Sequence, residues 1–132
     1  MIAFYLSFVF TITIISRVPS RNAQYNYLLF WTYRAIIEGK SYLILEIAWN
    51  IILFIPIGVL LMLAISYKNK VFIAIASCFL MSSLIEVIQL LSHRGLFEYD
   101  DIVHNTLGAT LGVCVYQLVS LIVKRFKSKR CN

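Results

Sequence analysis

The stretch from Leu43 to Tyr67, LILEIAWNIILFIPIGVLLMLAISY, carries a single charged side chain, that of Glu46. An α-helix needs about 20 mostly apolar residues to cross the hydrocarbon core of a bilayer. Such a helix satisfies its backbone polar groups internally, which an irregular segment exposed to lipid cannot do. The stretch therefore predicts a transmembrane helix, and this prediction decides the fold class.

The composition of the whole chain indicates the same class of protein. The 132 residues are 61% hydrophobic and 14% charged, with a formal net charge of +6, and the mean hydropathy is +0.83. A soluble domain is typically about half apolar and about a quarter charged. One domain of this length cannot hide such an apolar excess from water. We therefore predict an all-α integral membrane protein with a single domain, residues 1–132.

Three further stretches are apolar enough to be spans. They are residues 1–16, 71–91 and 102–123, which together with 43–67 predict a bundle of about four transmembrane helices. The first stretch is short, but it lacks the basic start and the small-residue cleavage site of a signal peptide. We interpret it as a span that enters the membrane obliquely or begins upstream.

The segment between the first two spans is dense in aromatic residues. Residues 25–37, YNYLLFWTYRAII, are too few to cross a bilayer. Tyr and Trp favour the headgroup level, where one end of the ring meets apolar surroundings and the other meets water. We expect an interfacial or re-entrant helix here, with a loop packed over the bundle end as the alternative.

The polar residues of the spans are expected in one half of the membrane. The second and fourth spans begin, and the third ends, on the side of the aromatic segment. The polar residues near these ends are Glu46, Asn50, Glu86, Gln89, Asp101, His104 and Asn105. The polar chemistry of the protein should therefore face one side.

In the third span, Glu86, Gln89 and His93 are spaced so that they share one helix face. A carboxylate within a span is costly in lipid and marks a functional site by default. One interpretation is an acid/base site with Glu86 and Asp101 as catalytic candidates. The structural alternative is that Arg94 neutralises Asp101 or Glu86.

A single stripe runs down the fourth span, with His104 beside it; its members are Asp101, Asn105, Gly108 and Gly112. Small residues four positions apart allow a neighbouring helix to approach closely. We expect the stripe to face protein, with its polar top against the polar end of the third span.

Pro56 interrupts the second span in the run NIILFIPIG, residues 50–58. Because proline lacks a backbone N–H, it removes one helical hydrogen bond and should kink the helix. The kink would free a carbonyl near Asn50, on the polar side of the bundle.

Basic residues indicate the orientation. Lys and Arg in short loops favour the cytoplasmic side, and the hairpin at 68–70 and the basic tail 124–132 carry more of them than the opposite side. This predicts cytoplasmic N- and C-termini and an outward polar cluster, with the reverse topology left open. Beside a span, the tail should meet anionic membrane lipids rather than nucleic acid.

The sequence shows no motif for a metal or a cofactor. Cys78, Cys114 and Cys131 lack metal-site and disulfide spacing and are interpreted as small hydrophobic residues. The histidines lack a zinc-binding pattern, and there is no nucleophile motif or phosphate-binding glycine loop. We expect no metal site, no cofactor and no nucleic-acid partner.

Three blocks occur in order: NIILFIPIG from Asn50, EVIQ from Glu86, and DDIVHNTLGATLG from Asp100, with Arg94 between the last two. Together they resemble the VanZ-like family of small bacterial membrane proteins, over roughly residues 26–115. The resemblance implies a multi-pass protein of the bacterial plasma membrane. The binding candidates that it carries over are Asn50, Glu86, Gln89, Arg94, Asp100, Asp101 and Asn105, and the structural ones are Pro56, Gly58, Gly108 and Gly112.

Three positions depart from the family pattern: Leu29 replaces a proline, Glu98 an aspartate and His104 an aliphatic residue. The first member of the family is associated with resistance to the lipoglycopeptide teicoplanin, without a change in the peptidoglycan precursor. The resemblance thus implies a cell-envelope role and a phenotype rather than a reaction.

Three functions are compatible with these features. We expect a non-enzymatic envelope protein that lowers susceptibility to lipoglycopeptides by binding the drug or a lipid-linked cell-wall precursor. The first alternative is a membrane enzyme acting on a lipid-linked substrate, with Glu86 as acid/base and Asp101 as its partner. The second is a small transporter or flippase subunit, which would require a homo-oligomer because four spans rarely enclose a pathway.

Overall fold

The structure is a computed structural model that describes residues 2–17, 19 and 24–130. Helices dominate it, and two short strands form one small sheet. The elements in chain order are α1 (Ile2–Phe10), the π-helical turn η1 (Thr11–Ile15), β1 (Gln24–Asn26), α2 (Trp31–Ile37), α3 (Leu43–Ala64), α4 (Lys70–Ser92), β2 (Leu96–Glu98) and α5 (Tyr99–Arg130).

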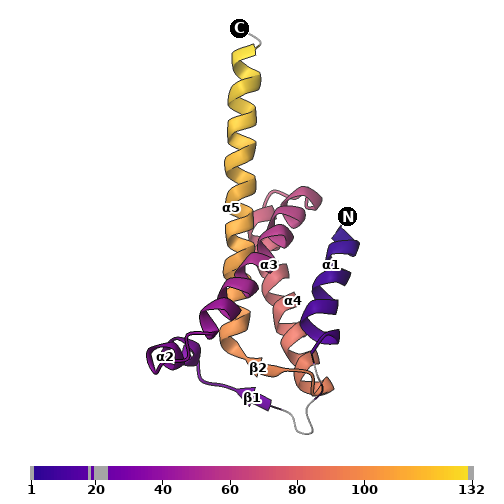
Figure 1. Cartoon of the computed structure of the whole chain (residues 1–132). Helices are drawn as coiled ribbons and strands as arrows, with labels where there is room; N and C mark the ends of the chain where they lie inside the picture. The colour runs from indigo at the N-terminus through magenta and orange to yellow at the C-terminus, as the bar shows by residue number, and fades with distance from the viewer. Residues whose placement is uncertain (1, 18, 20–23, 131–132) are drawn as a thin grey trace.

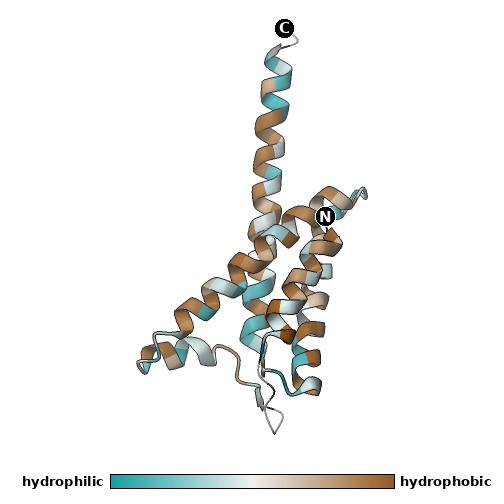
Figure 2. Cartoon of the chain, turned by 45° about the vertical axis from the view of Figure 1, so that its right-hand side comes forward, coloured by the Kyte–Doolittle hydropathy of each residue, from teal (hydrophilic) through white to brown (hydrophobic). Residues whose placement is uncertain are grey.

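Three helices, α3, α4 and α5, are long and apolar enough to cross a membrane. The start of α1, the α3–α4 connection and the C-terminal part of α5 lie toward one end of the molecule, whereas α2 and both strands lie at the other (Figure 1). Hydrophilic residues mark the first turns of α5, beside largely apolar helices (Figure 2). The predicted all-α membrane fold is confirmed.

The first predicted span corresponds to a shorter apolar helix, Ile2–Ile15, formed by α1 and η1 together. Of the four expected spans, three therefore have the length to cross a bilayer. Val9 and Ile14 are buried in a core that includes Phe54 and Cys78, from α3 and α4. The short helix is thus an integral part of the bundle. Met1 lies outside the described residues.

The long helices differ from the predicted spans at their ends. Helix α3 ends at Ala64 rather than at Tyr67, because Ile65 has an extended backbone. Helix α5 begins at Tyr99 and continues through the basic tail to Arg130, and Cys131 lies outside the part that the structure describes. The early start places two acidic residues in the first turn of α5, where they interact favourably with the positive end of the helix dipole.

The aromatic segment contains a strand and a short helix. The expected helix is α2, but the strand β1 was not predicted. It pairs in parallel with β2, with Tyr25 opposite Phe97 and Asn26 opposite Glu98. Several large apolar side chains of this segment are more than half exposed: Tyr25, Tyr27, Leu28, Leu29 and Phe30. They leave an aromatic, apolar surface at this end of the bundle.

Three glycines bring the backbones of α3 and α5 together. A Cβ atom on Gly108 would collide with the carbonyl oxygen of Ile51, and one on Gly112 with that of Ile55. Gly58 makes the reciprocal contact against α5. The glycine part of the predicted stripe therefore faces protein, as expected, but the helix it faces is α3.

Helix α3 continues through Pro56. Within one turn of the proline, the Tyr5 hydroxyl donates a hydrogen bond to the carbonyl oxygen of Leu53, over 2.9 Å. Because Tyr5 belongs to α1, this bond ties the short helix to the middle of α3.

Candidate functional site

The first turns of α5 are hydrogen-bonded to both neighbouring helices. Asn50 Nδ2 on α3 donates to Asp101 Oδ1 over 2.7 Å. Asn105 Nδ2 donates to the hydroxyl oxygen of Ser82 on α4 over 2.8 Å. Asp101, Asn105 and Ser82 are all buried. The polar top of the stripe therefore contacts α3 through Asp101 and α4 through Asn105, whereas the sequence predicted a contact with the third span.

Glu86 is a buried carboxylate that holds the strand β2. Its side chain is 1% exposed, and its Oε2 atom accepts the backbone N–H of Glu98 over 3.0 Å. This bond fixes the end of β2 against α4, immediately before α5 begins. The structure thus gives Glu86 a positioning contact with the backbone.

Gln89 and Arg94 bind the short N-terminal helix. Gln89 Nε2 donates to the carbonyl oxygen of Thr13 over 2.9 Å, and Arg94 Nη1 donates to that of Ile15 over 3.0 Å. The suggested pairing of Arg94 with Asp101 or Glu86 is therefore wrong, since its guanidinium reaches η1 instead. His93 leaves the face of Glu86 and Gln89 because it caps α4 in a left-handed conformation and is exposed.

Asp100 and His104 bind the aromatic segment. The two carboxylate oxygens of Asp100 accept the backbone N–H groups of Phe30 and Thr32, over 2.6 and 3.0 Å. The Tyr33 hydroxyl lies 2.8 Å from His104 Nε2. These contacts hold α2 against the start of α5.

A cleft of about 850 Å³ lies next to this cluster, between the short N-terminal helix and α3. Pockets for small molecules typically enclose about 300–1,000 Å³. The residues that line it are Tyr5, Phe8, Ile12, Thr13, Arg17, Trp31, Tyr42, Leu43, Glu46, Trp49, Asn50, Ile52, Leu53, Pro56, Leu96, Glu98 and Asp101. The cleft therefore joins a charged end to apolar walls.

The charged groups that line the cleft are three carboxylates and one guanidinium. The carboxylates belong to Glu46, Glu98 and Asp101, and the guanidinium belongs to Arg17. Within the described part of the chain, the only ion pair closer than 4.0 Å joins Arg34 of α2 to Glu38, the C-cap of the same helix, and both side chains lie on the surface. Arg17 therefore lies among the carboxylates without a direct contact that neutralises any of them.

Glu98 stands at the end of β2, outside the long helices, and is 7% exposed. Burial, together with the nearby carboxylates of Asp101 and Glu46, raises the pKa of its carboxyl to about 8, while Arg17 opposes them. At neutral pH, Glu98 thus carries its proton more often than an exposed glutamate does.

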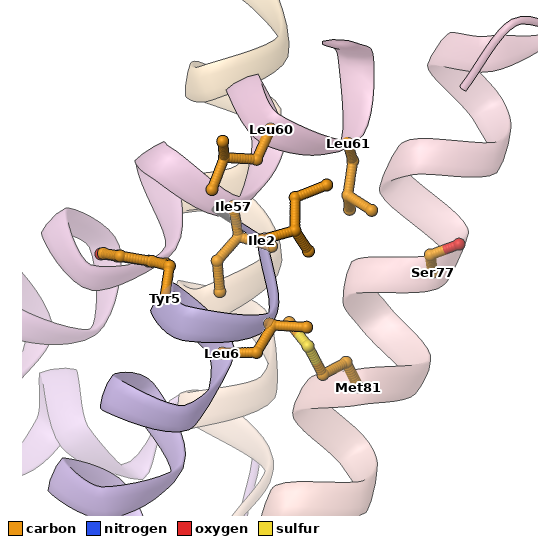
Figure 3. A pocket seen from close by; sticks show the side chains of 8 residues that line it. All are labelled: Ile2, Tyr5, Leu6, Ile57, Leu60, Leu61, Ser77 and Met81. Carbon is orange, nitrogen blue, oxygen red and sulfur yellow. The ribbon is translucent and has the colours of Figure 1, made fainter. Parts of the chain in front are cut away.

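A second cavity lies deeper along the short helix (Figure 3). It encloses about 50 Å³ and is almost wholly apolar. Its lining residues come from α1, α3 and α4: Ile2, Tyr5, Leu6, Ile57, Leu60, Leu61, Ser77 and Met81. A buried water molecule needs about two to four polar partners, which this apolar lining does not supply, so the cavity is a packing void beside the larger cleft.

The residues predicted for the site fall into three groups. Asn50, Pro56 and Asp101 line the cleft. Others are buried or bonded beside it without lining it: Glu86, Gln89, Arg94, Asp100 and Asn105. Gly58, Gly108 and Gly112 set the spacing of α3 and α5. Across residues 2–17, 19 and 24–130, no group of three or more His, Cys, Asp or Glu side chains is arranged to hold a metal ion.

Sequence reasoning missed three important residues of the cleft. Arg17 follows the first apolar stretch, Trp31 belongs to the aromatic segment, and Trp49 lies within the second predicted span; none of them was singled out as a site residue. Nothing in their spacing places them opposite Asp101. Their position depends on how the short helix packs against α3.

Comparison with known proteins identifies the family of this chain. A family model described as VanZ/LLP1 matches residues 2–120. No curated protein and no solved structure matches the chain. The matched region contains the short helix, the three long apolar helices up to residue 120, and the whole cleft. Since the match covers most of its length, the chain belongs to the VanZ/LLP1 family.

Proposed function

We propose that this VanZ/LLP1 protein acts in the bacterial plasma membrane as a non-enzymatic envelope protein that lowers susceptibility to lipoglycopeptides such as teicoplanin. It does so by holding an amphiphilic molecule in the cleft. The observation that carries the proposal is the make-up of this cleft, which joins Arg17, Glu98 and Asp101 at one end to apolar walls from α1 and α3. A molecule with a polar head and a hydrocarbon tail matches both parts.

The walls of the cleft favour access from the lipid phase. Trp49 and Ile52 on α3 are 65% and 54% exposed, and Phe8 on α1 is 48% exposed. Because α3 is long and apolar enough to cross a membrane, these exposed side chains would contact acyl chains. An amphiphile can then enter sideways, with its tail between the two helices.

The charge distribution supports an outward cleft. The basic residues near the C-terminal end of α5 lie at the end of the molecule opposite the strands and α2 (Figure 1), and basic residues favour the cytoplasmic side. With both termini cytoplasmic, the charged end of the cleft opens toward the cell wall. There it meets the drug and the lipid-linked cell-wall precursors.

Antibiotic susceptibility tests the proposal. A deletion strain is complemented with wild type, with Asp101→Asn in the cleft, or with Glu38→Gln on the surface as the matched carboxylate control. Wild type and Glu38→Gln should restore tolerance to teicoplanin, whereas Asp101→Asn should leave the strain sensitive at equal membrane abundance. Equal sensitivity of the deletion and wild-type strains would reject the resistance role.

A further inference from the structure

The charged end of the cleft has an excess of acceptors. Glu46, Glu98 and Asp101 line it together with Arg17 as the one guanidinium. Asp101 already accepts the amide of Asn50 on one oxygen. The excess of carboxylates over guanidinium favours a ligand group with positive charge at this end.

Two buried atoms of the cleft have no hydrogen-bond partner within the part of the chain that the structure describes. They are Oε1 of Glu98 and Nε1 of Trp31. Buried polar atoms are nearly always hydrogen-bonded, because an unmade bond costs about 1–3 kcal/mol. Both residues line the cleft, so a bound molecule is well placed to supply the missing partners.

The two atoms require opposite partners. An ionised Glu98 accepts hydrogen bonds, whereas the indole N–H of Trp31 only donates. A head group that satisfies both therefore carries a donor and an acceptor. A metal ion would satisfy only the carboxylate, and the described residues hold no cluster suited to one.

We infer that the ligand of the cleft is an amphiphile whose head pairs a protonated primary amine with a phosphate or ester oxygen. The ammonium group meets Glu98 and Asp101, and the oxygen accepts the N–H of Trp31 and faces Arg17. This assignment rests on the proposed function, since it specifies the head group of the amphiphile that the cleft holds. An amine together with oxygen acceptors occurs both in an aminoethyl phospholipid and in an amine-bearing lipoglycopeptide antibiotic.

Tryptophan fluorescence can report binding in this cleft. It has two tryptophans, Trp31 and Trp49, and both line the cleft. Bromine atoms on an acyl chain quench tryptophan fluorescence at contact distance.

The full-length protein is reconstituted in phosphatidylglycerol vesicles, and dibrominated phosphatidylethanolamine or phosphatidylcholine is added at increasing mole fraction. The two probes share phosphate, charge and tails, and differ in that choline has no N–H donors.

We expect phosphatidylethanolamine to quench with saturation at a lower mole fraction than phosphatidylcholine. Glu98→Gln should remove this difference, whereas the surface variant Glu38→Gln should retain it. The thermal midpoint of each variant in detergent, compared with that of wild type, checks that the variant keeps its fold. If teicoplanin displaces the brominated lipid, the antibiotic binds at the same charged end of the cleft. If it does not, the ligand of the cleft is the phospholipid. In either case, the support for an amine head is the preference for phosphatidylethanolamine that Glu98→Gln removes.

Two other outcomes overturn the inference in different ways. If both lipids saturate at the same mole fraction, or if the preference persists in Glu98→Gln, the amine assignment is wrong while the amphiphile cleft stands. If quenching rises linearly with mole fraction for every probe, no lipid occupies the cleft, and the proposed function loses its basis as well.

Discussion

Asp100 caps a helix that begins 69 positions before it in the chain: its Oδ1 atom accepts the backbone N–H of Phe30 over 2.6 Å. Its second carboxylate oxygen accepts the N–H of Thr32. Helix α2 has no side-chain cap of its own, and Phe30 adopts a left-handed conformation at its N-cap. The first N–H groups of a helix need acceptors, so α5 supplies the cap that the local sequence lacks.

Replacing Asp100 with Ala should release α2 from the bundle. Hydrogen bonds to a charged group contribute about 1.5–3 kcal/mol each, so the loss of two should speed amide exchange in α2 by at least about tenfold. Hydrogen–deuterium exchange of the full chain in micelles measures this rate. Asp100→Asn keeps one acceptor oxygen, so its exchange rate in α2 should lie between those of wild type and Asp100→Ala. Unchanged exchange in Asp100→Ala would show that α2 is held by other contacts.

Replacing Gly112 with Ala should destabilise the protein, although alanine favours helices. In an ordinary helix interior, Gly→Ala gains about 1 kcal/mol. Here the new Cβ meets the carbonyl oxygen of Ile55, so α3 and α5 must separate. The thermal midpoint in detergent should fall, and Gly108→Ala should act likewise against Ile51. Cys114→Ala, at an exposed position on α5, is the control. A raised midpoint in Gly112→Ala would contradict the close packing.

The sequence contained enough information to predict the helices and the one-sided polar end. Apolar length identifies the three long helices, and the chain direction alone places Glu86, Asn105 and Asp101 together, since successive spans alternate in direction. Small-residue spacing identifies Gly108 and Gly112 as contact positions. These inferences succeed because they depend on local pattern and on the geometry of antiparallel helices.

The remaining features of the site depend on tertiary packing. The partner of Arg94 is a backbone carbonyl of η1, and no side-chain pattern specifies a backbone acceptor. The parallel pairing of β1 with β2 joins strands of three residues, too short to show an alternating pattern. Arg17 reaches the cleft only because the short helix packs on α3. The sequence therefore showed the polar end, while the walls of the cleft required the structure.

A double-mutant cycle should detect the bond between Asn105 and Ser82. Hydrogen bonds between membrane helices contribute about 0.6 kcal/mol on average and about 1.7 at most. Asn105→Ala should lower the free energy of unfolding by more than this average, because it also leaves buried Ser82 without its hydrogen-bond partner. Ser82→Ala should add little once Asn105 is Ala. Unfolding in mixed micelles gives the four free energies. Strictly additive effects would indicate that the two side chains act independently.

The amine preference of the cleft should depend on pH through Glu98. Burial and the carboxylates of Asp101, Glu46 and Asp100 together raise the pKa of this carboxyl to about 8, against the opposing effect of Arg17. Glu86 also faces it from α4, through the backbone N–H of Glu98. Below pH 8, Glu98 is mostly protonated and must lose a proton to pair with an ammonium group.

Binding of the aminoethyl head should therefore strengthen as the pH rises from 6 to 8 and level off above 8. The half-saturating mole fraction should fall by at most about tenfold per pH unit, the limit for a single linked proton. The ligand amine, with a pKa near that of lysine at about 10.4, stays charged throughout this range. Quenching by brominated phosphatidylethanolamine at each pH measures the dependence. Glu98→Gln should flatten it, and an equal slope in that variant would assign the linked proton to another carboxyl group.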